Sequence, residues 1–426
     1  MFFKIKILYY FIKIKFERIF QLHYSKWYKK IKIFFFLKKL SESSFYSFLN
    51  IKKTRFIDIP IINKSIFMKN FDLINTCGIT ISQANEIALY SEKSRDFSSM
   101  IGDVSVGLSS GTSGNRGIFL VNESERAKWV AYILDRVISL GFKRQKIAFF
   151  LRANNELYES AKSKFISFNF FDIYIPFDNH LKRLDDLCPS ILIAQPSILI
   201  LLAKKKEINK LNISPKKIVS VAEVLTKEDK EYLQNVFNCK ISEVYQCTEG
   251  FLANSCSEGY LHFNEDFLVI EKKYINNDKS KFHPIITDLL RESQPVVRYE
   301  LNDIITEKKN CKCGSKFLAI EKIEGRSDDI VILLNSKGES VSIFPDIIRR
   351  TIILSDSRII DYAFIQNDNV FKLYIESSCD ESFLKAKNAL VKRFSEYNCN
   401  NFEIVQISTN KHKIGYKKRR VINENI

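Results

Sequence analysis

A rhythm of short apolar runs, separated by segments long enough for a helix, constrains the fold most strongly. The buried-strand candidates are Ile147–Leu151, Ile173–Ile175, Ile191–Ala194, Ile218–Val221 and Ile241–Tyr245. Such alternation is typical of a largely parallel sheet whose strands are joined by crossover helices. Asn122 and Glu125 resemble a capping box and predict the start of an amphipathic helix that precedes the first run. No repeat with a period of about 20–50 residues is present, which argues against a solenoid.

The rhythm changes near residue 325. Beyond that point, shorter strands, a turn at Lys337-Gly338 and a Lys-rich helix ending near Phe394 predict a compact α+β unit. At the other end, the pattern of residues 1–50 predicts helices, which end at a Ser-rich stretch. We therefore predict an α/β protein in three parts: a helical basic lead segment packed on the large domain (1–80), a large domain with mixed and parallel sheets (81–325), and a small mobile C-terminal domain (326–426).

Positive charge is concentrated at the N-terminus. Residues 1–55 hold 14 basic and 2 acidic residues, so the other 371 residues carry only +5 of the net charge of +17. A protein that coats nucleic acid is basic over its whole surface, so we expect no specific nucleic-acid partner.

The N-terminal segment is apolar, aromatic and cationic. Four lysines interrupt it long before the ~20 apolar residues that a membrane span needs. It also lacks a small-residue cleavage site, which argues against a signal peptide. Two interpretations remain for residues 1–40: a packed leading helix, which we favour, or a segment that rests on an anionic membrane face.

Nine cysteines without a secretory signal indicate a reducing compartment, and hence a cytoplasmic protein with membrane association as the open alternative. Cys311 and Cys313 form a knuckle-type pair, and Cys256 with His262 supplies a second pair upstream. Three thiolates and one imidazole suit a closed tetrahedral Zn²⁺ site of structural type. The alternative is that Cys256 and His262 are unrelated core or surface residues.

A loop rich in glycine and hydroxyl side chains follows the apolar residues that end at Leu108. Glycine lets backbone amides approach a phosphate closely, and hydroxyls add neutral donors. No Gly-Lys-Ser/Thr follows, so this is not a Walker loop, and a flexible turn is the alternative. The candidate phosphate-binding residues are Ser109, Ser110, Gly111, Thr112, Ser113, Gly114 and Gly117.

The sequence SSGTSGNRG resembles the phosphate loop of the adenylate-forming enzymes, the superfamily of acyl-CoA synthetases and related ligases. Residues 244–250 are similar to that superfamily's aromatic-Gly-x-Thr-Glu motif, although Gln246 stands where many members have glycine. The resemblance implies that Tyr245 lies against adenine, Thr248 meets the phosphate and Glu249 holds Mg²⁺. Ala222-Glu223 resembles the element on the other side of the adenine.

Two further motifs look like those of the phenylacetate-CoA ligase-like branch, a group of probable adenylate-forming enzymes. Residues 287–290 and 295–303 resemble the stretches that end the large domain, which implies that Asp303 accepts hydrogen bonds from ribose. Residues 324–329 resemble the hinge motif, which implies that Arg326 meets ribose or phosphate and that Asp328 is the pivot of a lid domain.

The late basic stretch, residues 411–421, resembles the segment that carries a catalytic lysine in the superfamily. The resemblance implies that Lys417 bridges the carboxylate and the α-phosphate during adenylation. Tyr416 is an extra residue between Gly415 and the lysine, so Lys418 remains a competitor.

The resemblance covers nearly the whole chain and includes a branch sometimes associated with surface-polysaccharide genes, some of whose members share the Cys and His arrangement. It implies ATP- and Mg²⁺-dependent activation of a carboxylic acid as acyl-adenylate, with release of pyrophosphate. Transfer to a thiol, coenzyme A or a carrier protein, would follow. The alternative is a catalytically degenerate adenylation fold that acts as a basic module on a membrane surface or on nucleic acid.

Overall fold

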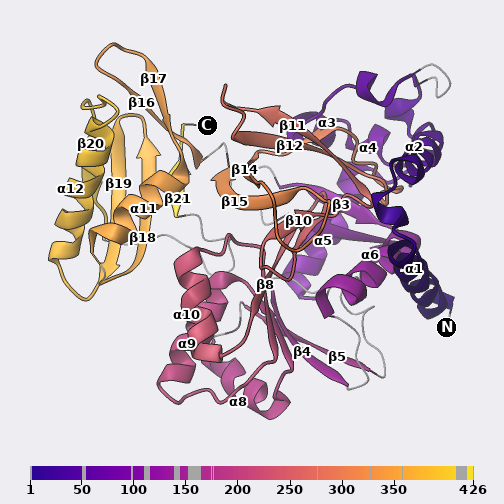
Figure 1. Ribbon diagram of the computed structural model, residues 1–426, viewed down its shortest axis with the longest axis horizontal. Helices are drawn as coiled ribbons and strands as arrows, with labels where there is room; N and C mark the ends of the chain where they lie inside the picture. The colour runs from indigo at the N-terminus through magenta and orange to yellow at the C-terminus, as the bar shows by residue number, and fades with distance from the viewer. Residues whose placement is uncertain are drawn as a thin grey trace. The chain divides into compact units, whose positions relative to one another are not determined.

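The computed structural model describes residues 2–49, 54–96, 99–109, 116–138, 144–151, 165–173, 175, 177–275, 277–326, 329–356, 358–408 and 420–425 (Figure 1). The chain forms two compact units. The first contains residues 1–273, 285–301 and 307–321, and the second contains residues 274–284, 302–306 and 322–426.

A mixed sheet forms the centre of the first unit (Figure 1). From β5 its strands lie in the order β5-β4-β6-β7-β8-β9-β10-β15. The sheet continues beyond β15 with β14 (Asp303–Lys308), β12 (Lys281–Asp288) and β11 (Leu268–Tyr274), and β13 (Tyr299–Glu300) pairs with β12. The bounds are β4 (Gln145–Leu151), β5 (Ile166–Asp172), β6 (Ile191–Ala194), β7 (Lys217–Val221), β8 (Ile241–Cys247), β9 (Gly250–Ser255), β10 (Leu261–Phe263) and β15 (Ala319–Arg326). From β5 to β8 all neighbours are parallel, as predicted, so their carboxyl ends share one edge. From β8 onward the pairing is antiparallel.

Crossover helices cover the parallel half of this sheet. They are α8 (Asp178–Leu187), α9 (Pro196–Glu207) and α10 (Lys227–Phe237). Leucines such as Leu184, Leu199 and Leu233 bury against Phe150 and Phe171 of the strands in one continuous apolar core. Because this packing hides one helical face, the remaining faces are free to be charged.

One predicted strand is misplaced. Residues 173–175 were expected to be extended, but the strand is β5, which ends at Asp172, and the chain turns there. The polar Asn169 interrupts the apolar pattern of β5, yet its amide bonds the Ile147 carbonyl oxygen of β4 at 3.3 Å. A partly buried polar group that finds a partner inside the sheet is compatible with a strand, although it interrupts the apolar pattern.

A separate antiparallel sheet precedes the large one and contains β1 (Met100–Ile101), β2 (Val104–Leu108) and β3 (Ile118–Val121). It packs with α3 (Lys64–Lys69), α4 (Phe71–Ile74) and α5 (Ile81–Ser94) around a small core that includes Phe71, Val106 and Leu120. The sequence analysis did not predict β3. The loop instead joins the hairpin β2–β3, where Leu108 pairs with Ile118. The capping box of Asn122 and Glu125 then begins α6 (Glu123–Ile133), as predicted.

The N-terminal helices α1 (Phe2–Ile19) and α2 (Lys26–Leu40) pack on the first unit. Lys15 and Arg18 reach the buried carboxylate of Asp135 at 2.8 and 2.9 Å, next to α6. Within the helix pair, the buried Glu17 accepts a hydrogen bond from Tyr28 at 2.8 Å. These contacts agree with the packed-helix interpretation for one face of α1. Among the described residues no helix is long and apolar enough to cross a bilayer.

The second unit has its own core and is the predicted α+β module. Its sheet has the order β20-β19-β18-β21, beside a hairpin β16–β17 that turns at Gly338. Phe364, Phe371 and Phe394 fill the core between this sheet and the helices. The bounds are β16 (Val331–Leu334), β17 (Ser340–Ile343), α11 (Pro345–Ser355), β18 (Ile359–Asn367), β19 (Val370–Ser377), α12 (Glu381–Ser395), β20 (Glu403–Gln406) and β21 (Val421–Asn423).

Candidate active site

The two described ends of the Gly/Ser/Thr loop are held together. The Ser109 amide donates to the Gly117 carbonyl oxygen, and the Gly117 amide donates to the Ser109 hydroxyl, both at 2.7 Å. Arg116 donates to the Ser109 carbonyl oxygen and to both carboxylate oxygens of Glu92. The base of the loop is therefore closed as a hairpin. The other candidates, Ser110, Gly111, Thr112, Ser113 and Gly114, lie outside the described residues.

Thr248 and Glu249 form the turn between β8 and β9, at the carboxyl edge of the parallel strands. The Thr248 hydroxyl donates to Glu249 Oε2 at 2.9 Å. Burial by itself raises the pKa of Glu249, but hydrogen bonds from Cys247, Thr248 and Tyr299 outweigh it and hold that pKa below its ordinary value. Glu249 is therefore an ionised, partly buried carboxylate, the kind of oxygen ligand that Mg²⁺ takes.

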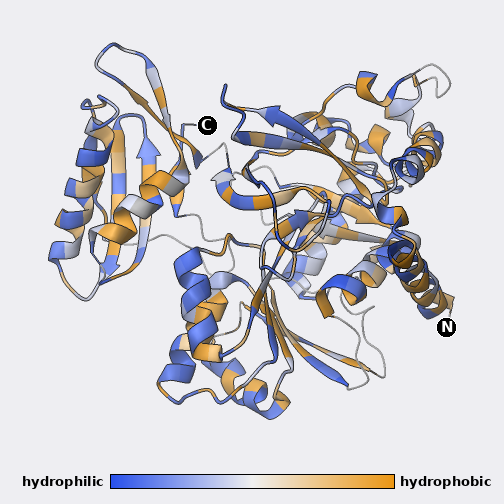
Figure 2. Ribbon diagram, in the orientation of Figure 1, coloured by the Kyte–Doolittle hydropathy of each residue, from blue (hydrophilic) through white to orange (hydrophobic). Residues whose placement is uncertain are grey.

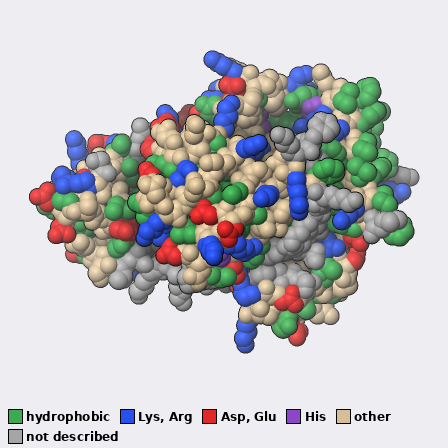
Figure 3. All heavy atoms as spheres, turned by 90° about the horizontal axis from the view of Figure 1, so that it is seen from below, with side chains coloured by type: hydrophobic (Ala, Val, Ile, Leu, Met, Phe, Trp, Pro, Cys, Tyr) green, Lys and Arg blue, Asp and Glu red, His purple; other side chains and the backbone are tan. Residues whose placement is uncertain are grey.

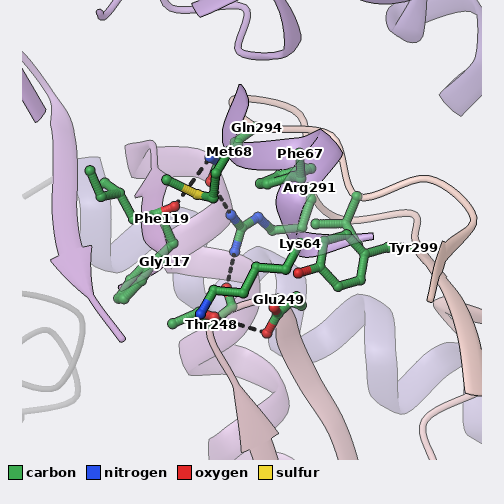
Figure 4. Close-up of a pocket in the computed structure, with 12 residues that line it drawn as sticks. Lys64, Phe67, Met68, Gly117, Phe119, Thr248, Glu249, Arg291, Gln294 and Tyr299 are labelled. Atoms are coloured by element: carbon green, nitrogen blue, oxygen red, sulfur yellow. Dashed lines mark hydrogen bonds between the residues drawn. The ribbon is translucent and has the colours of Figure 1, made fainter. Parts of the chain in front are cut away.

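A small pocket in the first unit brings these two motifs together (Figure 4). Gly117 at the loop base and the Thr248-Glu249 turn line the same cavity. The Lys64 side chain, from the start of α3, extends across it toward both, and Tyr299 closes the side nearest Glu249. A carboxylate, a hydroxyl and an ammonium group thus face one space. Together they suit a metal ion and the phosphate oxygens bound to it.

Arg291 joins the Thr248 turn to the strand that follows the loop. Its guanidinium donates to the carbonyl oxygens of Thr248 and Leu120 at 3.4 and 3.1 Å. The side-chain oxygen of Gln294 accepts hydrogen bonds from Arg291 and from the Leu120 amide, so Gln294 supports the contact between Arg291 and β3 (Figure 4). These residues hold β3 and the Thr-Glu turn in a fixed register.

Sequence reasoning missed Lys64, Arg291, Gln294 and Tyr299 as site residues. Arg291, Gln294 and Tyr299 lie within or beside the stretches that resemble the end of the large domain, so the motif was a signal whose individual roles were not assigned. Lys64 lies in residues 60–65, which also resemble the adenylate-forming enzymes, but a single lysine at the start of a short helix is common and no role was assigned to it.

The adenine-side candidates lie at the same sheet edge as the pocket. Val221 of β7 is paired with Val244 of β8, so Glu223 and Tyr245 follow at neighbouring strand ends. Glu223 accepts hydrogen bonds from the amide and hydroxyl of Ser197, in the first turn of α9, at 3.2 and 3.1 Å. Ligands of open α/β sheets characteristically bind beyond the carboxyl ends of the strands.

Asp303 and Arg326 belong to the second unit and are partners there. Arg326 Nε lies 3.8 Å from Asp303 Oδ1. Asp328, Lys417 and Lys418 lie outside the described residues, so their assigned roles stay predictions.

The predicted zinc ligands form a cluster in the first unit. The ligand atoms of Cys256, His262, Cys311 and Cys313 all lie within 4.8 Å of one another. Cys256 Sγ is 3.8 Å from Cys311 Sγ, and Cys313 Sγ is 3.4 Å from His262 Nε2. Tetrahedral zinc places two thiolates ~3.8 Å apart and a thiolate and an imidazole ~3.6 Å apart, by the usual bond lengths.

The surroundings of the cluster also fit a metal. His262 Nδ1 lies 2.9 Å from the Phe317 carbonyl oxygen, which orients the ring so that Nε2 points to the thiols. The four residues come from β10, the turn before it and the connection between β14 (Asp303–Lys308) and β15. The donor set therefore fits Zn²⁺, which would clamp that connection to the sheet.

Asp288, in the stretch resembling the end of the large domain, is buried beside the Thr-Glu turn. A Cβ on Gly250 would lie 2.7 Å from its Oδ2, so only glycine fits there. Burial is the main cause that raises the pKa of Asp288 to about 7, with the charge of Glu125 adding to it. The proton is therefore held more tightly in the folded chain than in the unfolded chain, where the pKa is 3.8.

We expect Asp288→Asn to change how stability depends on pH. Because the folded-state pKa is raised, this carboxyl group adds to the free energy of unfolding at low pH. That stabilisation is lost as pH rises through about 7. The difference in melting temperature, Asp288→Asn minus parent, should therefore increase by several degrees between pH 5 and pH 8. Asp278→Asn, an exposed control, should show no such trend; an equal trend in both would contradict the assignment.

Comparisons with known proteins agree with this architecture. No protein family model matches the chain. Protein CapK of Staphylococcus aureus is 24% identical over 253 residues, covering 57% of this chain and 55% of that protein, so the match spans about half of the relative's length.

Among solved structures, 2-hydroxyisobutyryl-CoA ligase bound to R3-HIB-AMP covers 93% of this chain and 89% of its own, with 14% identity and a TM-score of 0.67. Anthranilate-CoA ligase AuaEII bound to anthranoyl-AMP covers 74% and 66%, with 13% identity and a TM-score of 0.52. The amide bond synthetase McbA from Marinactinospora thermotolerans covers 74% and 68%, with 8% identity and a TM-score of 0.53.

The chain therefore has the fold of the adenylate-forming ligases, as its motifs predicted. The two CoA ligases among these neighbours were solved with acyl-adenylates bound.

Proposed function

We propose that this protein activates a carboxylic acid as acyl-adenylate at the expense of ATP, releasing pyrophosphate, and then transfers the acyl group to a thiol such as coenzyme A. The supporting observation is the pocket in which the loop base at Gly117, the Thr248-Glu249 turn and Lys64 meet. The order of the motifs, the fold and the acyl-adenylate ligands of similar structures agree with this activity. We also propose that the protein is cytoplasmic, because ATP and coenzyme A are available in the cytoplasm.

The reaction needs positioning more than proton transfer. The substrate carboxylate is already ionised and attacks the α-phosphorus of ATP, so no general base is required. The barrier falls when charge that develops on the phosphate oxygens meets oriented donors. In this proposal the loop amides, Thr248 and Lys64 provide those donors, and Tyr245 and Glu223 border the adenine.

The metal has one proposed ligand from the described residues. Glu249 would hold Mg²⁺, which neutralises phosphate charge when it is bound. The hydrogen bonds from Thr248 and Tyr299 keep this carboxylate ionised and oriented. Zn²⁺ at Cys256, His262, Cys311 and Cys313 would be structural, since four protein ligands leave no open position.

The remaining roles rest on the resemblance. Residues 326–426 would act as a lid that pivots at Asp328, with Asp303 and Arg326 directed to the ribose and phosphate. We also propose that the protein belongs to the phenylacetate-CoA ligase-like branch and that it takes part in surface-polysaccharide metabolism.

Exchange of labelled pyrophosphate into ATP tests the proposed activity. Purified protein is incubated with ATP, Mg²⁺ and pools of carboxylic acids, which are then divided until one acid remains. Label should enter ATP only when the right acid is present, because the step is reversible through the adenylate. If no acid pool supports exchange while ATP still binds, the degenerate fold is favoured. Two departures from the motifs point to that alternative: Gln246 stands where glycine is usual, and Tyr416 displaces Gly415 from the lysine.

Two alanine variants, at Lys417 and at Lys418, test which lysine is catalytic. We expect Lys417→Ala to abolish most exchange activity with a modest loss of ATP affinity, because an ammonium group attracts the phosphate most strongly when water is excluded. Lys418→Ala should lose far less. The reverse ranking would move the role to Lys418.

A further inference from the structure

An apolar stripe runs along the face of α1 that is turned away from the rest of the protein. Its residues are separated alternately by three and four positions, which places them on one helical face. They are Phe2, Ile5, Tyr9, Ile12, Phe16 and Ile19, and each is at least 53% exposed. The opposite face carries Ile7, Ile14 and Glu17, which are buried. The stripe is therefore not needed for the packing of α1.

The second helix extends this surface. Trp27 is 70% exposed, and Phe34 and Phe35 are also exposed. Figure 2 shows α1 mostly in hydrophobic colours interrupted by hydrophilic ones. In Figure 3, hydrophobic side chains gather, with some Lys and Arg among them, on the side of the first unit where Figure 1 places α1 and α2. We call these exposed apolar residues of α1 and α2 the N-terminal surface.

Lysines border the apolar stripe on both sides. At 100° per residue, Lys6 and Lys13 flank it on one side and Lys4 and Lys15 on the other. Lys4 and Lys13, with Lys30 and Lys38 of α2, are exposed and form no ion pair within the described part of the chain. Such long side chains can rest their stems on an apolar phase while their charges stay in water.

The positive charge of the N-terminal surface favours an anionic partner over a second copy of the chain. The spacing of the stripe would also suit a coiled coil with a second copy. Residues 2–40, however, hold eleven basic residues and a single acidic one, Glu17, which is buried and bonded to Tyr28 and Lys32. Two copies joined through this face would oppose lysine to lysine without compensating acids. An anionic lipid surface offers the complementary charge and accepts the aromatic residues at its interface.

We propose that α1 and α2 form a docking surface for an anionic phospholipid membrane, with α1 lying in the plane of the interface. The helix spans 18 residues, or about 27 Å, and buries its other face on the protein. Its apolar stripe enters the boundary between headgroups and acyl chains, and the flanking lysines meet the phosphates. This surface does not depend on the proposed adenylation.

The test is sedimentation of the full chain with vesicles. Binding to phosphatidylcholine vesicles containing phosphatidylglycerol should be at least tenfold tighter than to phosphatidylcholine alone, and should weaken as salt is added. Ile5→Gln/Ile12→Gln/Phe16→Gln should reduce this affinity at least tenfold. Lys4→Gln/Lys13→Gln should reduce it roughly fivefold per lysine.

Controls separate binding from misfolding. Leu384→Gln/Val391→Gln, which removes exposed apolar residues of α12, should bind like the parent. Circular dichroism should give unchanged melting temperatures for all variants, since the altered side chains are exposed. If the stripe variant unfolds, the lysine variant carries the test alone. Failure to bind anionic vesicles at low salt, or equal binding by the lysine variant, would overturn the proposal. So would a dimer, seen by light scattering, that the stripe variant dissociates.

Discussion

Glu249→Gln is expected to lower the rate of pyrophosphate exchange by about a hundredfold or more, as is usual when one charge-stabilising contact is removed. The reason is electrostatic. Glutamine keeps the size of the side chain and can still accept from Thr248 and Tyr299, but it lacks the negative charge that would hold Mg²⁺. More Mg²⁺ should be needed for half-maximal exchange, and ATP binding without metal should change little.

A matched control removes a carboxylate that the pocket does not use. Glu231 is an exposed residue of α10, and its carboxylate lies 3.9 Å from the ammonium nitrogen of Lys227. Glu231→Gln should keep full exchange activity, and both variants should melt within a few degrees of the parent. Exchange by Glu249→Gln at the parental rate, with the same Mg²⁺ dependence, would remove Glu249 from the metal site.

Cys311→Ser is expected to lose most of the zinc and to lower the melting temperature by on the order of 10 °C. The parent should hold about one Zn²⁺ per chain. The four ligands join the β14–β15 connection to the turn before β10, so breaking one frees both segments. Tyr24 and His23, between α1 and α2, pack on Phe317 of the same connection, so the N-terminal helices should loosen as well.

Elemental analysis of protein purified reduced and without chelator measures the metal directly. Cys188→Ser is the control, because Cys188 is exposed and lies outside the cluster among the described residues. It should keep the zinc and the melting temperature of the parent. A parent free of zinc, or a Cys311→Ser variant that still holds a full equivalent, would contradict the four-ligand assignment.

Local patterns predicted most elements of the fold. The parallel strands β4, β6, β7 and β8 were recognisable because each is a short apolar run between helix-length segments. The capping box that begins α6 was readable because its two hydrogen bonds join residues only three positions apart. β3 and β5 were harder: β3 pairs with β2 across the Gly/Ser/Thr loop, and β5 includes a polar residue whose partner lies on another strand.

The sequence alone determined which chemical groups are present and in what order: a glycine and hydroxyl loop, a Thr-Glu turn, four soft metal ligands and a cationic aromatic N-terminus. These are properties of neighbouring residues, so they can be read without a fold.

Only the tertiary structure decided which of these groups meet. Gly117, Glu249 and Lys64 face one pocket because a hairpin, a strand end and a short helix converge there. The four zinc-ligand candidates were named from the sequence, but whether their two distant segments meet was decided by the fold. The outward stripe of α1 was likewise decided by which face packs on the protein. Such proximities depend on long-range strand pairing and packing, which local sequence patterns do not encode.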